Sequence, residues 1–247
     1  MKFSLYHKLV QKIQNARWLT APLFFGQHPA VVEFLVRNYS RHSKKILDIG
    51  ARRSPYTRSL QGLVVGIDLP SQDDSKLGFN YSSLQQFSNG HHFALFGSGE
   101  CLPFKPDTFD VVIMIEVIEH IKEDRQALTE IHAVLKTDGI LIISTPNGET
   151  FPKPAKYHIR HYRPEELKKL IDDLFNIKLF WPLFPKGKLW HESIKSLSDM
   201  LNQKDIISVI RHIFLVWVYW IVTGWCFFRT REKDTTTLFV VAQKGPS

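Results

Sequence analysis

The sequence predicts an α/β fold in which a doubly wound, mostly parallel sheet carries helices on both faces. Two observations lead to this prediction. First, an apolar strand at 45–49 ends in an acid and a glycine and then turns towards a helix, which is how such a sheet presents a nucleotide-like cofactor. Second, apolar strands and polar helical segments alternate from 63 to 147. A chain of 247 residues with 44% hydrophobic content suits one such domain with an extra element.

The amino-terminal segment, 1–43, is predicted to form a helical cover. Apolar side chains at helical spacing lie beside basic ones, which is typical of a basic amphipathic helix; they are Leu5, Leu9, Val10 and Ile13, with Lys8, Lys12 and Arg17. This helix either packs over the sheet or the cofactor cleft, or lies on a membrane surface. Pro29 begins a second helix. Polar residues interrupt the apolar run that a secretory signal needs.

The first strand and its turn are the most informative segment. Ile46, Leu47 and Ile49 form the strand interior, and Asp48 and Gly50 mark its carboxyl end. Ser54 and Pro55 are predicted to cap and begin the next helix. This pattern alone is common among α/β proteins and does not by itself establish cofactor binding.

The segments that follow strengthen the argument. The second strand, 63–70, ends in Asp68, at about 20 residues from the first turn, where a carboxylate can accept hydrogen bonds from two ribose hydroxyls. Residues 97–121 lead into a third strand, and 123–147 supply a helix, a Lys-Thr-Asp-Gly stop and a fourth strand.

Together these ordered segments resemble the class I S-adenosylmethionine-dependent methyltransferases, in particular the group acting on small molecules and lipids that includes the ubiquinone-pathway O-methyltransferases. The resemblance covers 45–170 and implies a Rossmann-like sheet. It also implies a sixth strand at 174–184 and an antiparallel closing strand at 235–244. The whole chain then reads as one domain, with a helical cover (1–43), a cofactor-binding core (44–184), an apolar helical insertion (185–234) and a closing strand and tail (235–247).

The resemblance implies S-adenosylmethionine as cofactor and assigns its contacts. Asp48 orders the first loop, Gly50 lets the backbone pass the cofactor, and Asp68 binds the ribose. The remaining contacts fall on later loops; they are Ser98 and Gly99 at the adenine edge, with Glu100 beside them, and Glu116 after the third of these strands. Glu100 is equally well interpreted as a solvated loop acid.

One departure from the family pattern lies in the first loop. The family has glycine at the positions of Gly50, Arg52 and Ser54, and this chain keeps only the first. Glycine serves there because the backbone approaches the cofactor and adopts positive φ. Arg52 therefore either points away or pairs with the carboxylate of the methionine moiety. The alternative is a degenerate fold that no longer binds cofactor.

His120 is the predicted catalytic base. It follows the strand in the segment EVIEHI, and a histidine pKa is easily tuned near neutral pH. Its alternative role is that of a helix-start residue bonded to the backbone. Glu116, Glu119 and His120 repeat an arrangement associated with a divalent metal in the ubiquinone-pathway relatives. Much of the wider family carries Glu-His here without metal, so no metal site is predicted.

A second polar cluster precedes a helix that begins at Pro164. The resemblance implies that this loop covers the acceptor; its candidate residues are His158, Arg160, His161 and Tyr162. The alternative is a set of solvated loop residues. His91 and His92 follow an Asn-Gly turn and are expected at the surface.

Charge and composition limit the partners. The net charge of +8 suits anionic lipid, nucleic acid or an acidic substrate. Nucleic acid is not expected, because the chain lacks the Asn/Asp-Pro-Pro-aromatic pattern, the Pro-Cys pair and any run of aromatic residues interleaved with basic ones. Two cysteines give neither a disulfide framework nor zinc spacing, which favours a reducing, cytoplasmic compartment.

The segment 213–228 carries no charge and is flanked by basic residues. As a helix its 16 residues would extend about 24 Å, short of the ~30 Å hydrocarbon core. Because strands of one sheet flank the insertion, a single crossing is disfavoured. Peripheral contact with the inner membrane face through 206–228 is expected, supported by Trp217, Trp220 and Trp225. The alternatives are an intraprotein lid or a homodimer contact.

The predicted function is therefore methyl transfer to a hydroxyl, or less readily a carbon, of a lipophilic or lipid-linked small molecule at the membrane surface. Two alternatives stay open. One is a soluble small-molecule methyltransferase with an apolar lid or dimer contact. The other is a non-catalytic protein that kept the fold.

Overall fold

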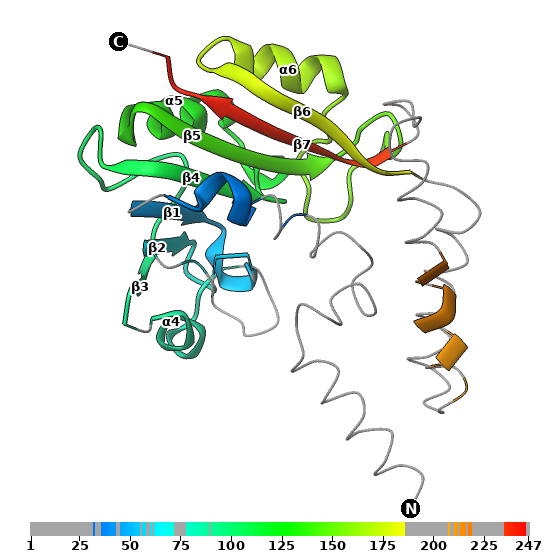
Figure 1. Cartoon of the computed structure of the whole chain (residues 1–247), viewed down its shortest axis with the longest axis horizontal. Coiled ribbons are helices and arrows are strands. Elements are labelled where there is room, and N and C mark those ends of the chain that lie inside the picture. The colour runs from blue at the N-terminus through cyan, green and yellow to red at the C-terminus, as the bar shows by residue number, and fades with distance from the viewer. Residues whose placement is uncertain are drawn as a thin grey trace, which may run out of the picture. The chain divides into compact units, whose positions relative to one another are not determined.

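The computed structural model describes residues 32, 36–42, 45–54, 56–57, 60, 62–71, 78–88, 90–185, 207, 210–211, 213–215, 217–218 and 235–245. The chain divides into two compact units. Figure 1 shows the helices and strands that the structure describes. The larger unit comprises Leu35–Leu183 and Thr237–Ser247, and the smaller comprises Met1–Phe34 and Phe184–Thr236. All of the predicted cofactor residues belong to the larger unit.

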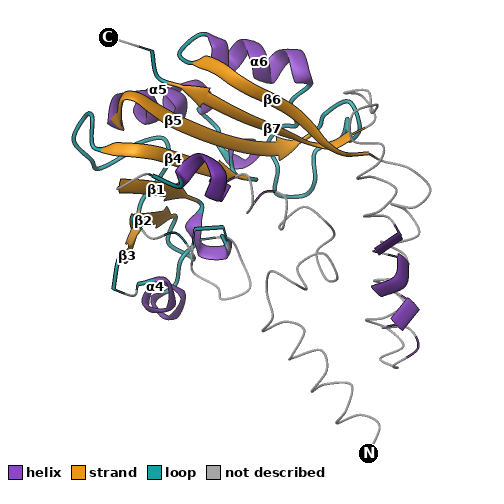
Figure 2. Cartoon of the chain, in the orientation of Figure 1, coloured by secondary structure: helices purple, strands orange, loops and turns teal. Residues whose placement is uncertain are grey.

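A seven-stranded sheet of order β3-β2-β1-β4-β5-β7-β6 organises the fold (Figure 2). Its strands are β1 (Lys45–Ile49), β2 (Leu63–Asp68), β3 (His92–Phe96), β4 (Phe109–Ile115), β5 (Leu135–Pro146), β6 (Asn176–Pro185) and β7 (Thr235–Gln243). β1 pairs in parallel with β2 and β4, and parallel pairing continues to β3 and β5. β7 pairs antiparallel with β5. The predicted mixed sheet with an antiparallel closing strand is confirmed.

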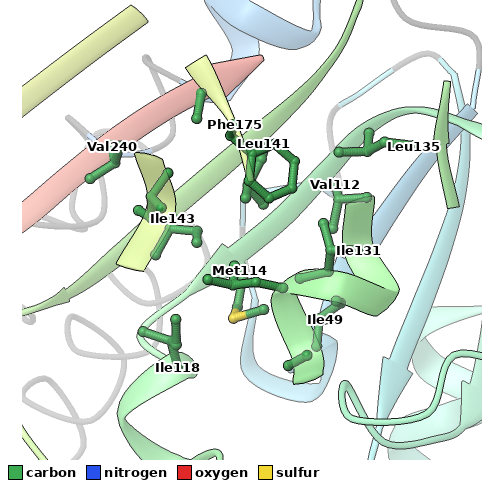
Figure 3. Close-up of a cluster of buried hydrophobic side chains, with 14 of the residues drawn as sticks. Ile49, Val112, Met114, Ile118, Ile131, Leu135, Leu141, Ile143, Phe175 and Val240 are labelled. Atoms are coloured by element: carbon green, nitrogen blue, oxygen red, sulfur yellow. The ribbon is translucent and has the colours of Figure 1, made fainter. Parts of the chain in front are cut away.

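The main core lies between the sheet and two helices, α5 (Asp124–Val134) and α6 (Pro164–Asp172). Alternate residues of β4, β5 and β7 point to this side, and Figure 3 shows Val112, Met114 and Ile143 packed among them. Ile131 of α5 and Ile171 of α6 are fully buried against these strands. Each such aliphatic side chain contributes about 1.5–3 kcal/mol on burial, so this cluster holds the strand ends in fixed positions.

α6 begins as its sequence predicts. Pro164 occupies the first turn, where a missing N–H costs nothing, and Glu166 accepts a hydrogen bond from the backbone N–H of Arg163 at 2.9 Å. This fixed start anchors the end of the preceding loop. That loop carries the second predicted polar cluster.

Three features differ from the sequence-based expectations. The helix expected from Ser54 and Pro55 is not present at Tyr56 and Thr57, which form a bend, and Pro55 lies outside the described residues. Ser54 itself is extended at the end of a 3-10 helix, η1 (Ala51–Arg53). In this loop the Thr57 hydroxyl donates a hydrogen bond to the buried carboxylate of Asp48. Strand β3 and helix α4 (Tyr81–Phe87) were not predicted. His92 is buried at the start of β3, although His91 is exposed as expected.

The amino-terminal cover and the insertion fall mostly outside the described residues. Residues 36–40 are helical, as are the described residues at 207, 210–211, 213–215 and 217–218. The expected contacts of Trp220 and Trp225 lie outside the described part of the chain. Among the residues that the structure describes, no helix is both long and apolar enough to cross a membrane.

Candidate functional site

A cavity of about 390 Å³ opens at the carboxyl ends of β1, β2 and β4. The strand order reverses between β1 and β4, and the crevice at such a switch point is where doubly wound sheets bind ligands. Eight of the nine predicted site residues line the cavity; they are Gly50, Arg52, Asp68, Ser98, Gly99, Glu100, Glu116 and His120. The ninth, Asp48, lies beneath it, buried in β1.

Gly50 forms the turn at the floor of this cavity. Its φ of 78° is left-handed, and its N–H donates to the Ile67 carbonyl at 2.8 Å. A Cβ on this residue would lie 2.3 Å from Cγ2 of Val117. Both the dihedral angle and the lack of space therefore require glycine here. This residue lets the β1 turn pass close to the cavity.

Asp48 lies buried beneath the cavity and binds the loop that follows β1. Its carboxylate accepts a hydrogen bond from the Thr57 hydroxyl at 2.7 Å. Burial raises the pKa of Asp48 to about 6, although this hydrogen bond opposes the shift. The negative charge of nearby Asp68 raises the pKa further. Asp48 thus ties the loop after β1 to the strand.

Asp68 stands at the rim of the cavity with both oxygens oriented by backbone. Its Oδ2 accepts from the N–H of Arg52 at 3.2 Å, and its Oδ1 accepts from the N–H of Leu69 at 2.9 Å. Burial raises the pKa of Asp68 above its usual range, against the lowering effect of these two hydrogen bonds. The loop residue Arg52 therefore supports Asp68 through its backbone, which is a role that its side-chain type did not predict.

The turn after β3 closes another side. The Ser98 hydroxyl accepts from the N–H of Glu100 at 3.2 Å. One carboxylate oxygen of Glu100, Oε1, accepts from the N–H groups of Lys122 and Glu123 at 3.0 and 2.9 Å. Glu100 is thus neither a free loop acid nor only a lining residue. It fixes the segment between His120 and α5.

Glu116 turns the chain after β4. It has a φ of 55°, in the left-handed region that non-glycine residues rarely adopt. Its N–H donates to the Ser144 carbonyl at 2.9 Å, and its Oε1 accepts from the Ser144 hydroxyl at 2.8 Å. These two bonds to β5 hold the unusual turn. They also set the direction of the 3-10 helix η2 (Ile118–His120) that follows.

Glu119 and His120 lie together on η2. Glu119 is fully buried; its Oε2 accepts from the Thr145 hydroxyl at 3.0 Å, while its Oε1 has no hydrogen-bond partner. Burial raises the pKa of Glu119 well above its usual range, and the charge of Glu116 raises it further. His120 Nε2 lies 4.0 Å from that Oε1, and His120 Nδ1 bonds the Tyr157 carbonyl at 2.8 Å.

The loop from Gly148 to Arg163 brings two more histidines to η2. The rings of His120 and His158 meet edge to face with centroids 4.6 Å apart, and His158 Nδ1 lies 2.6 Å from His161 Nε2. His161 Nδ1 bonds the Phe151 carbonyl at 2.7 Å. Burial lowers the pKa of His158, and the two neighbouring histidines lower it further.

The other two residues of the predicted cluster anchor this loop. Arg160 forms an ion pair with Asp124 at the start of α5, and the Tyr162 hydroxyl donates to the same carboxylate at 2.7 Å. The Glu119 carbonyl accepts from the N–H of Ile159 at 2.8 Å. The structure therefore separates His158, which contacts His120, and His161, which contacts His158, from Arg160 and Tyr162, which hold the loop in place.

Sequence reasoning missed that Glu119, His120 and His158 come together. Ligand atoms from all three lie within 4.8 Å of one another. The available signal was the pair of histidines at 158 and 161 within the loop, but the sequence does not show which strand end that loop crosses. The roles assigned to the site residues from the resemblance stay predictions.

The cavity is acidic although the chain is basic. Asp68, Glu100 and Glu116 line it, with Arg52 and His120 as the basic side chains on its wall, whereas the chain has a net charge of +8. Carboxylates at the walls of a cleft favour a cationic ligand over a neutral one.

Comparison with protein families matches residues 25–205 to the methyltransferase domain family. A mitochondrial ubiquinone biosynthesis O-methyltransferase of Schizosaccharomyces pombe is 34% identical over 106 residues, which is 41% of this chain and 38% of that protein. (S)-Coclaurine N-methyltransferase of Thalictrum flavum is 30% identical over 128 residues, which is 52% of this chain and 28% of that protein. These matches span well under half of the length of either relative.

Solved structures share the fold at low identity. Phosphoethanolamine N-methyltransferase 2 of Haemonchus contortus, solved with S-adenosylhomocysteine, has a TM-score of 0.59 and 17% identity over 87% of this chain and 52% of its own. The [4+2]-cyclase SpnF has a TM-score of 0.56 and 14% identity over 88% of this chain and 81% of its own. The family match covers most of the chain, and the sheet is mostly parallel with an antiparallel closing strand, as expected. The chain therefore belongs to the methyltransferase domain family, of the class I type that uses S-adenosylmethionine.

Proposed function

We propose that this protein transfers the methyl group of S-adenosylmethionine to a hydroxyl, or less readily to a carbon, of a lipophilic or lipid-linked small molecule. The observation that carries the proposal is one continuous cavity that joins the orienting groups of β1 and β2 to His120 beyond β4. Its two ends differ in chemistry, which suits a cofactor on one side and an acceptor on the other.

At the cofactor end, backbone N–H groups hold the binding acid in place. The N–H groups of Arg52 and Leu69 orient the two oxygens of Asp68, so the outer lone pairs can accept hydrogen bonds from a pair of ribose hydroxyls. Ser98 and Gly99 provide the wall expected to meet the adenine edge. The Arg52 side chain is the candidate partner for the amino-acid carboxylate of the cofactor.

S-Adenosylmethionine supplies an already activated methyl group on a positively charged sulfur when it is bound. The acidic lining of the cavity therefore favours this cation over its neutral product. Because the methyl group needs little further activation, this chain contributes mainly alignment, and a base where the acceptor has a proton to lose.

At the acceptor end, His120 is the proposed base. A carbonyl oxygen can only accept, so the contact of His120 Nδ1 with the Tyr157 carbonyl places the ring proton on Nδ1. The Nε2 lone pair is then left to take a proton from an acceptor hydroxyl. Buried Glu119, 4.0 Å from Nε2, is placed to stabilise the charged ring that results.

Action at a membrane surface is proposed from the insertion. The described residues at 207–218 carry four exposed apolar side chains, Ile207, Ile210, Phe214 and Trp217. Their spacing places them on one helix face, with exposed Arg211 beside them. Such a face suits the boundary between lipid headgroups and acyl chains, and the flanking basic residues suit anionic lipid. The alternative is a lid or homodimer contact of a soluble small-molecule methyltransferase.

Calorimetry with S-adenosylhomocysteine tests the cofactor assignment first. The intact chain should bind it with micromolar affinity, on the order of −8 kcal/mol. No binding by the folded protein would favour a non-catalytic relative with a degenerate first loop.

Incubation of a lipid extract with methyl-labelled cofactor then identifies the acceptor class. Flotation with anionic vesicles, compared with the Phe214→Ser/Trp217→Ser variant, tests the membrane assignment; equal flotation of the two proteins would contradict it.

A further inference from the structure

At the end of the cavity that contains His120, three side chains turn atoms that accept hydrogen bonds towards one another. Glu119 Oε1 is buried and has no partner, although a buried carboxylate oxygen is costly to leave unsatisfied. His120 and His158 provide the other two groups, and the ligand atoms of the three residues lie within 4.8 Å of one another. A cation placed between the three groups would satisfy the unpartnered oxygen of Glu119 and the two imidazole nitrogens together.

The surrounding hydrogen bonds decide where the imidazole protons are. The Phe151 carbonyl accepts from His161 Nδ1, so the neutral ring of His161 has its lone pair on Nε2. That lone pair receives the proton of His158 Nδ1 at 2.6 Å. The Tyr157 carbonyl likewise fixes the proton of His120 on Nδ1. Both His120 and His158 therefore have a free lone pair on Nε2, the arrangement that ligand histidines adopt when their other nitrogen is held by an outer partner.

We propose that Glu119, His120 and His158 hold a divalent cation, with His161 as the residue that positions His158. Glu116 is not one of the ligands in this arrangement, because its Oε1 accepts from Ser144 and its backbone is fixed in a left-handed turn. The third ligand instead comes from the loop between β5 and α6. The ligand set differs in this respect from the Glu116, Glu119 and His120 arrangement that the resemblance suggested.

The donor atoms indicate which class of cation binds. Two imidazole nitrogens and one carboxylate oxygen suit zinc and neighbouring divalent transition metals, whereas magnesium prefers six oxygen ligands. The cation also joins η2 to the loop at His158. Ordering of that loop over the acceptor then depends on the cation as well as on the anchors at Asp124.

This inference rests on the proposed function and makes it more specific. A divalent cation polarises an acceptor oxygen as a Lewis acid when it is bound. His120 then acts as a ligand, and its role as a free base belongs to the protein without cation. The role of His120 as a ligand can be separated from its role as a base, because His158 is needed to bind the cation but not for proton transfer to His120.

Zinc binding to the full chain, stripped of metal with chelator, tests the inference without any turnover assay. Titration calorimetry should show one Zn²⁺ per chain and no comparable binding of Mg²⁺. Added Co²⁺ should give visible absorption bands of a site with nitrogen ligands. His158→Ala should weaken Zn²⁺ binding by at least about tenfold, and His161→Ala by about 10–100-fold, the usual effect of an outer partner. His161→Gln, whose amide oxygen can still accept from His158, should recover part of that loss.

Two controls keep the result interpretable. Exposed His91, replaced by Ala, controls for adventitious binding at surface histidines. Glu116→Gln should keep Zn²⁺ affinity within about twofold. If Glu116→Gln weakens zinc as much as His158→Ala does, or if the folded wild-type chain takes no zinc, the inference is wrong. Calorimetry with S-adenosylhomocysteine on the same samples separates this inference from the proposed function. If the folded chain binds S-adenosylhomocysteine but takes no zinc, the cation site is refuted and the proposed function is not.

Discussion

At the proposed cofactor end of the cavity, the polar groups come from turns that follow β1, β2 and β3 directly, and backbone N–H groups orient them. The proposed acceptor end is built differently. There, His120 on η2 contacts His158 from a loop that enters after β5, and His158 in turn contacts His161, so that side chains orient one another. The first end depends on local turn geometry, and the second depends on a tertiary contact. Substitutions should therefore separate the two ends into binding effects and turnover effects.

The largest effect is expected at the acceptor end. His120→Ala should lower turnover by ~10²-fold or more, because it removes the proposed base and the Nε2 lone pair. Affinity for S-adenosylhomocysteine should stay nearly unchanged. Steady-state kinetics and calorimetry on one preparation measure both, with His91→Ala as the matched histidine control. An equal loss of cofactor affinity would assign His120 a structural role and remove the distinction between the two ends.

The second effect concerns pH and Asp48. Its pKa in the folded chain, about 6, lies above the usual 3.8, so the folded state holds its proton more tightly than the unfolded state. The stabilisation is complete below the usual pKa and is lost as the pH rises through about 6. A difference of about 2 pKa units corresponds to about 3 kcal/mol.

Asp48→Asn removes this titration and keeps an oxygen for Thr57. The free energy of unfolding of the wild type, minus that of the variant, should therefore fall by about 2.5 kcal/mol between pH 4 and pH 7. Urea unfolding at several pH values measures the difference, with exposed Asp172→Asn as control. A difference that does not change with pH would mean that Asp48 is not the buried, proton-holding group described here.

The third effect is confined to the cofactor end. Asp68→Ala should weaken binding of S-adenosylhomocysteine by about 1.5–3 kcal/mol, the scale of a hydrogen bond to a charged group. Zinc affinity should not change, because Asp68 is not one of the proposed ligands. Asp172→Ala is the matched control. Unaltered nucleoside binding in Asp68→Ala would refute the ribose assignment.

The smallest effect concerns the turn itself. Gly50→Ala should destabilise the fold by at least about 1–2 kcal/mol for the left-handed conformation, with a further cost from the contact with Val117. Adding Val117→Ala should recover the steric part and leave the conformational part. Urea unfolding of the two single variants and the double variant measures the recovery. Additive losses would show that the contact with Val117 is not what excludes a side chain.

The sequence predicted the larger features of the fold because they have local causes. The apolar strands β1, β2, β4 and β5 and the start of α6 at Pro164 follow from periodicity and turn chemistry. β3 was missed because its exposed edge residues, Phe93, Leu95 and Phe96, alternate with only two buried ones. The helix expected after Ser54 is not present at Tyr56 and Thr57, and the buried hydrogen bond between Thr57 and Asp48 is not visible in a local pattern.

The sequence by itself determined the acid and glycine at the end of β1, the acid at the end of β2, and thus the cofactor end of the cavity, because each group lies within a few residues of the strand that positions it. Only the tertiary structure decided that Glu119 keeps an unpartnered oxygen, that Glu100 supports the segment before α5, and that His158 rather than Glu116 stands with His120. The physical reason is that these contacts join segments far apart in the chain, and core packing between the sheet, α5 and α6 sets their separation.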